Sequence, residues 1–182
     1  MINSIGFIEL NSIARGIGTA DAMVKAAEVT LMFSKPVCPG KFIIMVNGDV
    51  GAVKASIASG LDFGGQYVVD NVLLASVHPE LIGAINGTPD IEKVNSLGVI
   101  EFYSIAAAVV AADAAAKAAN VTLIEVRLGI GIGGKSYVTL TGDVGAVNQA
   151  VEVGANTCRD SGMFINKIVI PSPRKEVFLN LM

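Results

Sequence analysis

Apolar and polar positions follow the same order in the two halves of this 182-residue chain. Short apolar, β-branched runs predict strands, and Ala-, Met- and Lys-rich stretches that open on capping residues predict helices. In the first half we expect strands at 5–10, 29–34, 41–47 and 67–76, and helices at 21–28, 50–59 and 79–82. In the second half we expect strands at 97–102 and 163–170, a hairpin at 121–141, and helices at 109–119 and 144–159.

This order of elements is the ferredoxin-like βαββαβ arrangement, and it predicts an α+β fold. Each half should form a four-stranded antiparallel sheet with its helices on one face. The halves also repeat in sequence, because Gly6–Leu31 matches Gly98–Leu123 at 15 of 26 positions. We therefore expect two tandem domains, residues 1–90 and 91–182, joined by a linker near residues 86–95.

The amino-acid composition indicates that each domain buries part of its surface against another domain or subunit. Hydrophobic residues make up 52% of the chain and charged residues 16%, against roughly 45–50% and 25% in typical soluble proteins, which indicates extensive burial between domains or subunits. No apolar run reaches the roughly 18 residues of a membrane span, and no leader is recognisable, so we expect a soluble, cytosolic protein. The net charge of −3 without a basic cluster argues against nucleic acid and membrane partners.

A nucleotide-binding motif occurs in the second half, but its context argues against that function. Residues 129–136, Gly-Ile-Gly-Ile-Gly-Gly-Lys-Ser, satisfy the phosphate-loop pattern. In such loops a helix begins directly after the lysine, because its N-terminal amides hold the phosphates. Here Tyr137–Thr141 follows, and its β-branched residues predict a strand. We interpret the segment as a glycine-rich hairpin loop.

The corresponding loop of the first half differs in its chemistry. Pro36 and Pro39 flank Cys38, and we expect this loop to stay outside the sheet ladder. The second cysteine, Cys158, has no repeat counterpart and is expected to be a packed thiol. Neither a disulfide framework nor a zinc site within one chain is indicated. With His78 as the only histidine, the sequence offers no catalytic constellation and predicts no enzyme.

The repeated segments resemble the bacterial microcompartment (BMC) shell proteins, in the form with two fused BMC domains. The resemblance is carried by Gly6–Glu9, Asp21–Val29 and Gly-Asp-Val-Gly-Ala-Val, each of which recurs in the second half. It implies a homotrimer that imitates a hexamer and tiles with other shell proteins into a microcompartment shell in the bacterial cytoplasm. It also implies that Lys25 and Lys117 make contacts at the tile edge.

In this family the loop between the second and third strands lines the central pore. The resemblance therefore assigns the pore to Pro36, Val37, Cys38, Pro39 and Gly40, and to Gly131, Ile132, Gly133 and Gly134. One branch, associated with propanediol utilisation, holds a 4Fe-4S cluster through a Cys-Pro-Gly-Lys segment, which Cys38–Lys41 matches residue by residue. This similarity implies Cys38 as the cofactor and metal ligand, with one cluster per trimer.

Three thiolates around one axis can bind three irons of a cubane cluster and leave the fourth to a small ligand. The implied role is electron transfer, or transport of the cluster, across the shell, with enclosed redox enzymes as further partners. Two other functions stay open. One is a shell trimer with a metabolite pore and no cluster, and the other is a metabolite-binding regulatory protein built from tandem ferredoxin-like domains.

Overall fold

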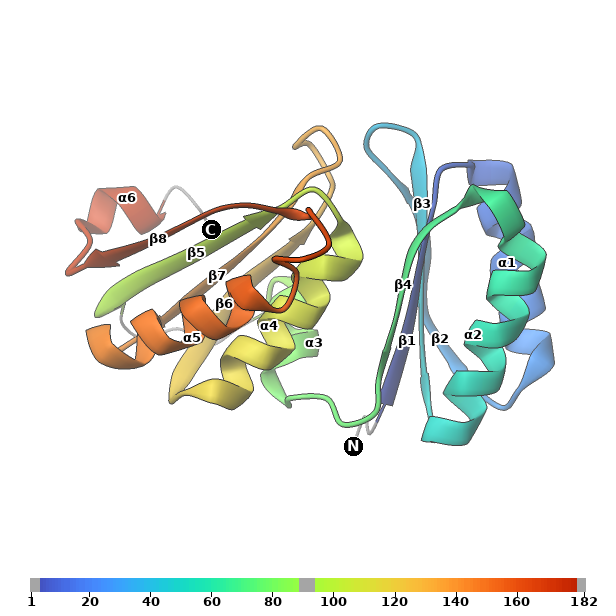
Figure 1. The fold of residues 1–182 in the computed structure, drawn as a ribbon, viewed down its shortest axis with the longest axis horizontal. Coiled ribbons are helices and arrows are strands. Elements are labelled where there is room, and N and C mark those ends of the chain that lie inside the picture. Colours follow the sequence, from blue (N-terminus) through green and yellow to red (C-terminus); the bar gives the residue numbers. More distant parts are fainter. Residues whose placement is uncertain (1–3, 89–93, 180–182) are drawn as a thin grey trace. The chain divides into compact units, whose positions relative to one another are not determined.

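The computed structural model describes residues 4–88 and 94–179, which form an α+β fold with two similar sets of elements (Figure 1). The first set is β1 (Ser4–Leu10), α1 (Ile13–Ala26), β2 (Thr30–Val37), β3 (Lys41–Gly48), α2 (Val50–Gly64), the short 3-10 helix η1 (Gly65–Tyr67), β4 (Val68–Leu74) and α3 (Glu80–Asn86). The second set is β5 (Ser96–Phe102), α4 (Ile105–Ala118), β6 (Val121–Leu128), β7 (Ser136–Gly142), α5 (Val144–Asn156), β8 (Phe164–Pro171) and α6 (Lys175–Leu179).

Each set contains a four-stranded antiparallel sheet. The strand orders are β2-β3-β1-β4 and β6-β7-β5-β8, with all neighbours antiparallel. Helices α1 and α2 pack against the first sheet, and α4 and α5 against the second (Figure 1). This confirms the predicted fold class and the ferredoxin-like order of strands. None of the helices in the described ranges is long and apolar enough to cross a membrane.

The chain divides into two compact units that do not follow the sequence halves completely. The first unit consists of residues 1–77 with 129–134, and the second of residues 78–128 with 135–182. The β6–β7 loop thus groups with the first unit, and α3 groups with the second. Part of the predicted linker, residues 89–93, lies outside the described residues, so the boundary at residues 90 and 91 stays a prediction.

Helices α1 and α4 begin earlier than the sequence pattern predicts. The side chain of Ser12 caps α1 by accepting a hydrogen bond from the Arg15 amide, and Ser104 caps α4 in the same way through the Ala107 amide. The prediction that α1 starts near residue 21 is wrong because two glycines interrupt its pattern. Gly16 lies inside α1, and only glycine fits there, because a Cβ at this position would lie 2.4 Å from the Phe42 ring.

Pro36 lies inside β2, and the prediction that it stays outside the ladder is wrong. It pairs with Phe42 of β3, one position before the end of the strand. β2 is an edge strand of its sheet, and an edge position tolerates a residue that has no N–H to donate. The loop predicted at residues 35–40 is therefore shorter, with only residues 38–40 in the turn.

Glycines set how closely each second helix approaches its sheet. A Cβ on Gly98 would lie 2.7 Å from Val151 and 2.9 Å from Val147, both on α5, and Gly6 has the same relation to α2. Valine side chains cannot swing aside as long side chains do. The repeat therefore keeps a small residue at this position of both sheets.

We predict opposite effects for two glycine-to-alanine replacements in the second domain. Gly98→Ala should lower the free energy of unfolding by about 2 kcal/mol, because its Cβ overpacks the helix–sheet contact. Gly145→Ala should raise it by about 0.5–1 kcal/mol, because Gly145 lies in the first turn of α5 with open space around it. Guanidinium unfolding at one chain concentration measures both, and equal effects would contradict the packing explanation.

Candidate functional site

Cys38 lies at the tip of the hairpin between β2 and β3. The turn comprises residues 38–40, and it is closed by a 3.0 Å hydrogen bond from the Gly40 amide to the Val37 carbonyl. The Cys38–Pro39 peptide bond is cis, and Gly40 has a φ of +91°, which favours glycine. The Cys38 side chain is half-buried. The turn therefore presents one thiol at a fixed place on the hairpin.

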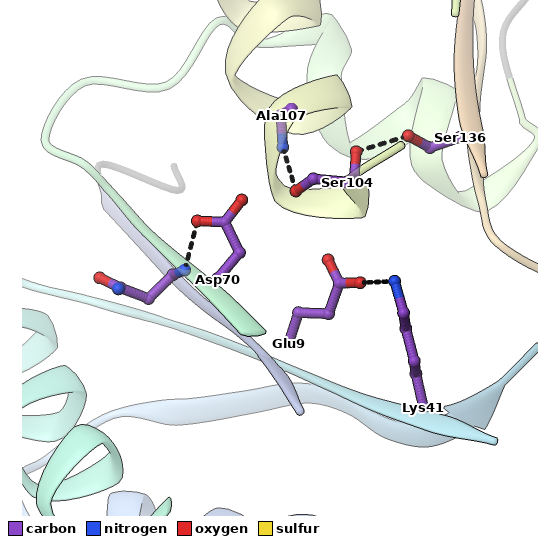
Figure 2. A network of polar contacts seen from close by, with 7 residues as sticks. Glu9, Lys41, Asp70, Ser104, Ala107 and Ser136 are labelled. Carbon is purple, nitrogen blue, oxygen red and sulfur yellow. Dashed lines mark hydrogen bonds and ion pairs between the residues drawn. The ribbon is translucent and has the colours of Figure 1, made fainter. Parts of the chain in front are cut away.

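A buried ion pair lies directly behind this turn. Lys41, the first residue of β3, places Nζ 2.6 Å from Oε1 of Glu9 on β1 (Figure 2). The Glu9 side chain is fully buried and that of Lys41 is 21% exposed. The pair fixes the start of β3 against the centre of the sheet. It therefore holds one end of the Cys38 turn.

The β6–β7 loop carries no comparable donor. Its backbone has positive φ at Gly129, Gly131, Gly133 and Gly134, where side chains are strained. Lys135 pairs with Glu101 at 3.0 Å, which repeats the Glu9–Lys41 contact, but both side chains are more exposed, at 47% and 36%. No helix follows Lys135, because β7 starts at Ser136. A strand in place of a helix after Lys135 excludes a phosphate-binding loop, as the sequence context indicated.

Within the first compact unit the two loops come close together. A Cβ on Gly134 would lie 2.5 Å from the Pro39 ring and 2.8 Å from the Cys38 carbonyl oxygen. Glycine is thus required at this place for a steric reason as well as for its backbone conformation. In the described part of the chain no group of three or more His, Cys, Asp or Glu residues could hold a metal ion. One chain therefore brings Cys38 alone to this place.

Beyond the glycine loop, β6 and β7 carry a polar cluster. The Tyr137 hydroxyl donates a 2.9 Å hydrogen bond to Glu125, whose other carboxylate oxygen lies 2.6 Å from Nε of Arg127. Burial, together with the hydrogen bond to Glu125, raises the pKa of Tyr137. The Tyr137 hydroxyl is therefore neutral at pH 7 and acts as a donor. Ser136 extends the polar contacts of β7 by donating to the Ser104 carbonyl at 2.6 Å (Figure 2).

The two lysines predicted at the tile edge lie in the last turns of α1 and α4. Each pairs with an aspartate four residues earlier, Lys25 with Asp21 and Lys117 with Asp113. The Lys25 side chain is 72% exposed, whereas that of Lys117 is 42% exposed and its partner Asp113 only 6%. Lys25 is thus the more accessible of the two.

The remaining chemically distinctive residues lie in structural positions. Cys158 is 8% exposed and its thiol lies 3.8 Å from the Ala107 carbonyl, so it packs against α4. The backbone amide of His78 donates to Asp113 at 2.7 Å, which anchors the chain just before α3. Both contacts lie within the second compact unit.

Comparison with known proteins decides the family. The sequence profile described as the BMC domain matches residues 4–77 and again residues 96–173. The chain belongs to the BMC-domain family. The two matched BMC domains contain β1–β4 and β5–β8 respectively.

Named relatives align with nearly the whole length of this chain. The microcompartment shell protein PduT of Citrobacter freundii is 42% identical over 182 residues, which cover all of this chain and 99% of PduT. The carboxysome assembly protein CcmO of Synechococcus elongatus is 30% identical over 98% of this chain and 68% of its own length. A crystal structure of a microcompartment protein from Desulfitobacterium hafniense matches with a TM-score of 0.89 and 48% identity, covering 98% and 99% of the two chains.

Membership of the BMC-domain family establishes the broad role of the chain. It is a structural component of a bacterial microcompartment shell in the cytoplasm and not an enzyme. BMC shell proteins oligomerise and assemble with other shell proteins. The Glu–Lys pairs at residues 9 and 41 and at residues 101 and 135 occur in both BMC domains, and the sequence reasoning missed them. The available signal was a glutamate in each first strand and a lysine at the start of the third strand, or directly before it.

Proposed function

We propose that the chain forms a homotrimer in which six BMC domains surround a pore, and that this trimer is a tile of the shell. The tandem repeat supports this, because three fused pairs supply the six similar domains of a ring. The composition supports it as well, since 52% hydrophobic residues leave too little polar surface for isolated domains.

We infer further that Cys38 of three chains holds a 4Fe-4S cluster in the pore. The observation that carries this is the position of Cys38 in a Cys-Pro-Gly-Lys turn whose end is anchored by the Glu9–Lys41 pair. The donor set fits, because a half-buried thiol on each of three symmetric hairpins supplies three thiolates for a cubane cluster. The site-specific difference between the repeats fits too, since the alternate hairpins carry glycines and would leave room between the cysteines.

When bound, the cluster would supply one-electron redox chemistry at the shell. The chain's own residues position the thiol: Gly40 allows the turn, and Lys41 fixes where β3 begins. The partners of such a site are redox enzymes enclosed by the shell. The cluster would either pass electrons across the shell or be delivered through it.

The cluster is tested by chemical analysis of protein purified without air. We expect a brown trimer that contains iron and acid-labile sulfide. A trimer that stays colourless and iron-free after anaerobic reconstitution would exclude the cluster and leave a shell tile with a metabolite pore.

Tiling is tested most cleanly at Lys25. We expect the unaltered trimer to form ordered sheets in the electron microscope, and we predict that Lys25→Glu abolishes them. Folding should be little affected, because the Lys25–Asp21 pair is exposed and contributes only about 0.3–0.5 kcal/mol. Lys117→Glu is a poorer test, since Asp113 also accepts the His78 amide and its environment is buried.

The matched control for this experiment is Lys54→Glu. Lys54 is exposed on α2 and its replacement changes the net charge by the same amount. Sheets should form from the Lys54 variant and not from the Lys25 variant, while both keep the trimer mass. Ordered sheets of unchanged spacing from Lys25→Glu would refute the edge contact.

A further inference from the structure

Helix α3 ends the first repeat in sequence but packs within the second compact unit. It lies on β6 and beside α4 (Figure 1). The Glu80 carboxylate accepts a 2.9 Å hydrogen bond from the Leu123 amide, and the preceding segment is held by the bond from His78 to Asp113. Leu81 and Ala84 of α3 are 0% and 1% exposed. The tail of one domain thus covers a surface of the next.

The equivalent surface of the first domain is open. We call it the α1–β2 surface and define it by Asp21, Val24 and Leu31, which lie 92 positions before Asp113, Ala116 and Leu123. Leu31 is 41% exposed, whereas Leu123 is 1% exposed. The side chain of Asp21 is 59% exposed, against 6% for Asp113. Since leucine and aspartate occupy these two positions in both domains, the difference in their exposure comes from what covers them.

Helix α6 is the counterpart of α3 in the second repeat. Each helix follows the last strand of its domain, and each comes directly or shortly after a proline, Pro79 or Pro173. Lys175, Glu176 and Val177 are all exposed, with Val177 at 48%. On the second unit, α3 already covers the surface formed by α4 and β6. The Val177 side chain of α6 is therefore an apolar surface that the second unit does not cover.

We propose that α6 of one chain docks on the α1–β2 surface of a second copy of the chain. The inference rests on the proposed trimer, in which each domain is followed by another around the ring. Within the chain, α3 follows the first domain and packs on the second domain. In the same way, α6 follows the second domain and packs on the first domain of the next chain. The contact is head-to-tail, so the ring closes when every tail is seated. Val177 meets Leu31 and Val24, which pairs apolar surface with apolar surface.

Disulfide trapping tests the docking in the full chain. Leu31→Cys and Val177→Cys are combined in a Cys38→Ala background, and both positions are exposed in the single chain, so folding should be unaffected. Mild oxidation should convert the chain into covalent oligomers on a non-reducing gel. Two chains that each carry only one of these two replacements, with tags of different size, should give a covalent heterodimer when co-expressed. The control combines Val177→Cys with Leu123→Cys, which α3 covers, and should give no product.

Native mass spectrometry of the same samples separates the possible failures. A trimer that gives no cross-link overturns the docking and leaves the proposed trimer standing. A cross-link confined to single chains, without heterodimer, also overturns it and assigns α6 to its own first domain. Absence of any trimer refutes the proposed function itself, and the docking with it.

Discussion

Cys38→Ala is expected to remove all cluster iron and sulfide from the anaerobically purified protein while leaving the trimer intact. The reason for complete loss is symmetry, because a single replacement removes all three thiolates from the pore. Folding should survive, since the turn is closed by the Gly40–Val37 hydrogen bond and the Cys38 side chain is half-buried rather than part of the core. The measurement is iron and sulfide content together with the visible absorption of the trimer.

The second cysteine supplies the control. Cys158→Ala removes a thiol that packs against Ala107 and should leave iron content unchanged, at a modest cost in stability. Iron retained in Cys38→Ala and lost in Cys158→Ala would place the cluster elsewhere. If both variants keep the iron content of the unaltered protein, neither thiol binds the cluster, and the proposed pore site is refuted.

The sheet topology could be predicted from the sequence because the strand-forming runs occur in the same order in both halves of the repeat. Two independent copies of the same pattern predicted the order of elements, and both sheets have the expected antiparallel order. The start of α4 was less accessible to sequence reasoning. Ala106, Ala107 and Ala108 are all buried, as are most of its later residues. A helix buried on so many sides has no amphipathic pattern to mark where it begins.

The position of the Cys38 turn could be predicted from the sequence, but the long-range contacts around it could not. The turn around Cys38 follows from Pro39 and Gly40, whereas Pro36 lies inside β2. The Glu9–Lys41 pair joins residues 32 positions apart, and the cover of Leu123 by α3 joins residues 43 positions apart. Such contacts depend on the strand register and on which unit a helix packs with, which local patterns do not encode.

Lys41→Met is expected to destabilise the protein far more than Lys135→Met, although the two lysines are repeat equivalents. Removing Lys41 leaves the buried Glu9 carboxylate without the ammonium 2.6 Å away, and loss of one partner of a buried pair costs about 3 kcal/mol. The Lys135–Glu101 pair is 3.0 Å long and both side chains are partly solvated, so its loss should cost about 0.5 kcal/mol. Chemical unfolding at equal chain concentration compares the two.

A double replacement separates the cost of burying the Glu9 carboxylate without the Lys41 ammonium from the contribution of the ion pair. Glu9→Gln combined with Lys41→Met removes both charges, and it should recover most of the stability lost in Lys41→Met alone, because no carboxylate is left buried without a cation. No recovery would mean that the hydrocarbon stem of Lys41, rather than its charge, supports the start of β3. Equal losses in Lys41→Met and Lys135→Met would contradict the difference in burial between the two pairs. Because Lys41 directly follows the Cys38 turn, the same variants also measure how firmly the hairpin that carries the thiol is held to its sheet.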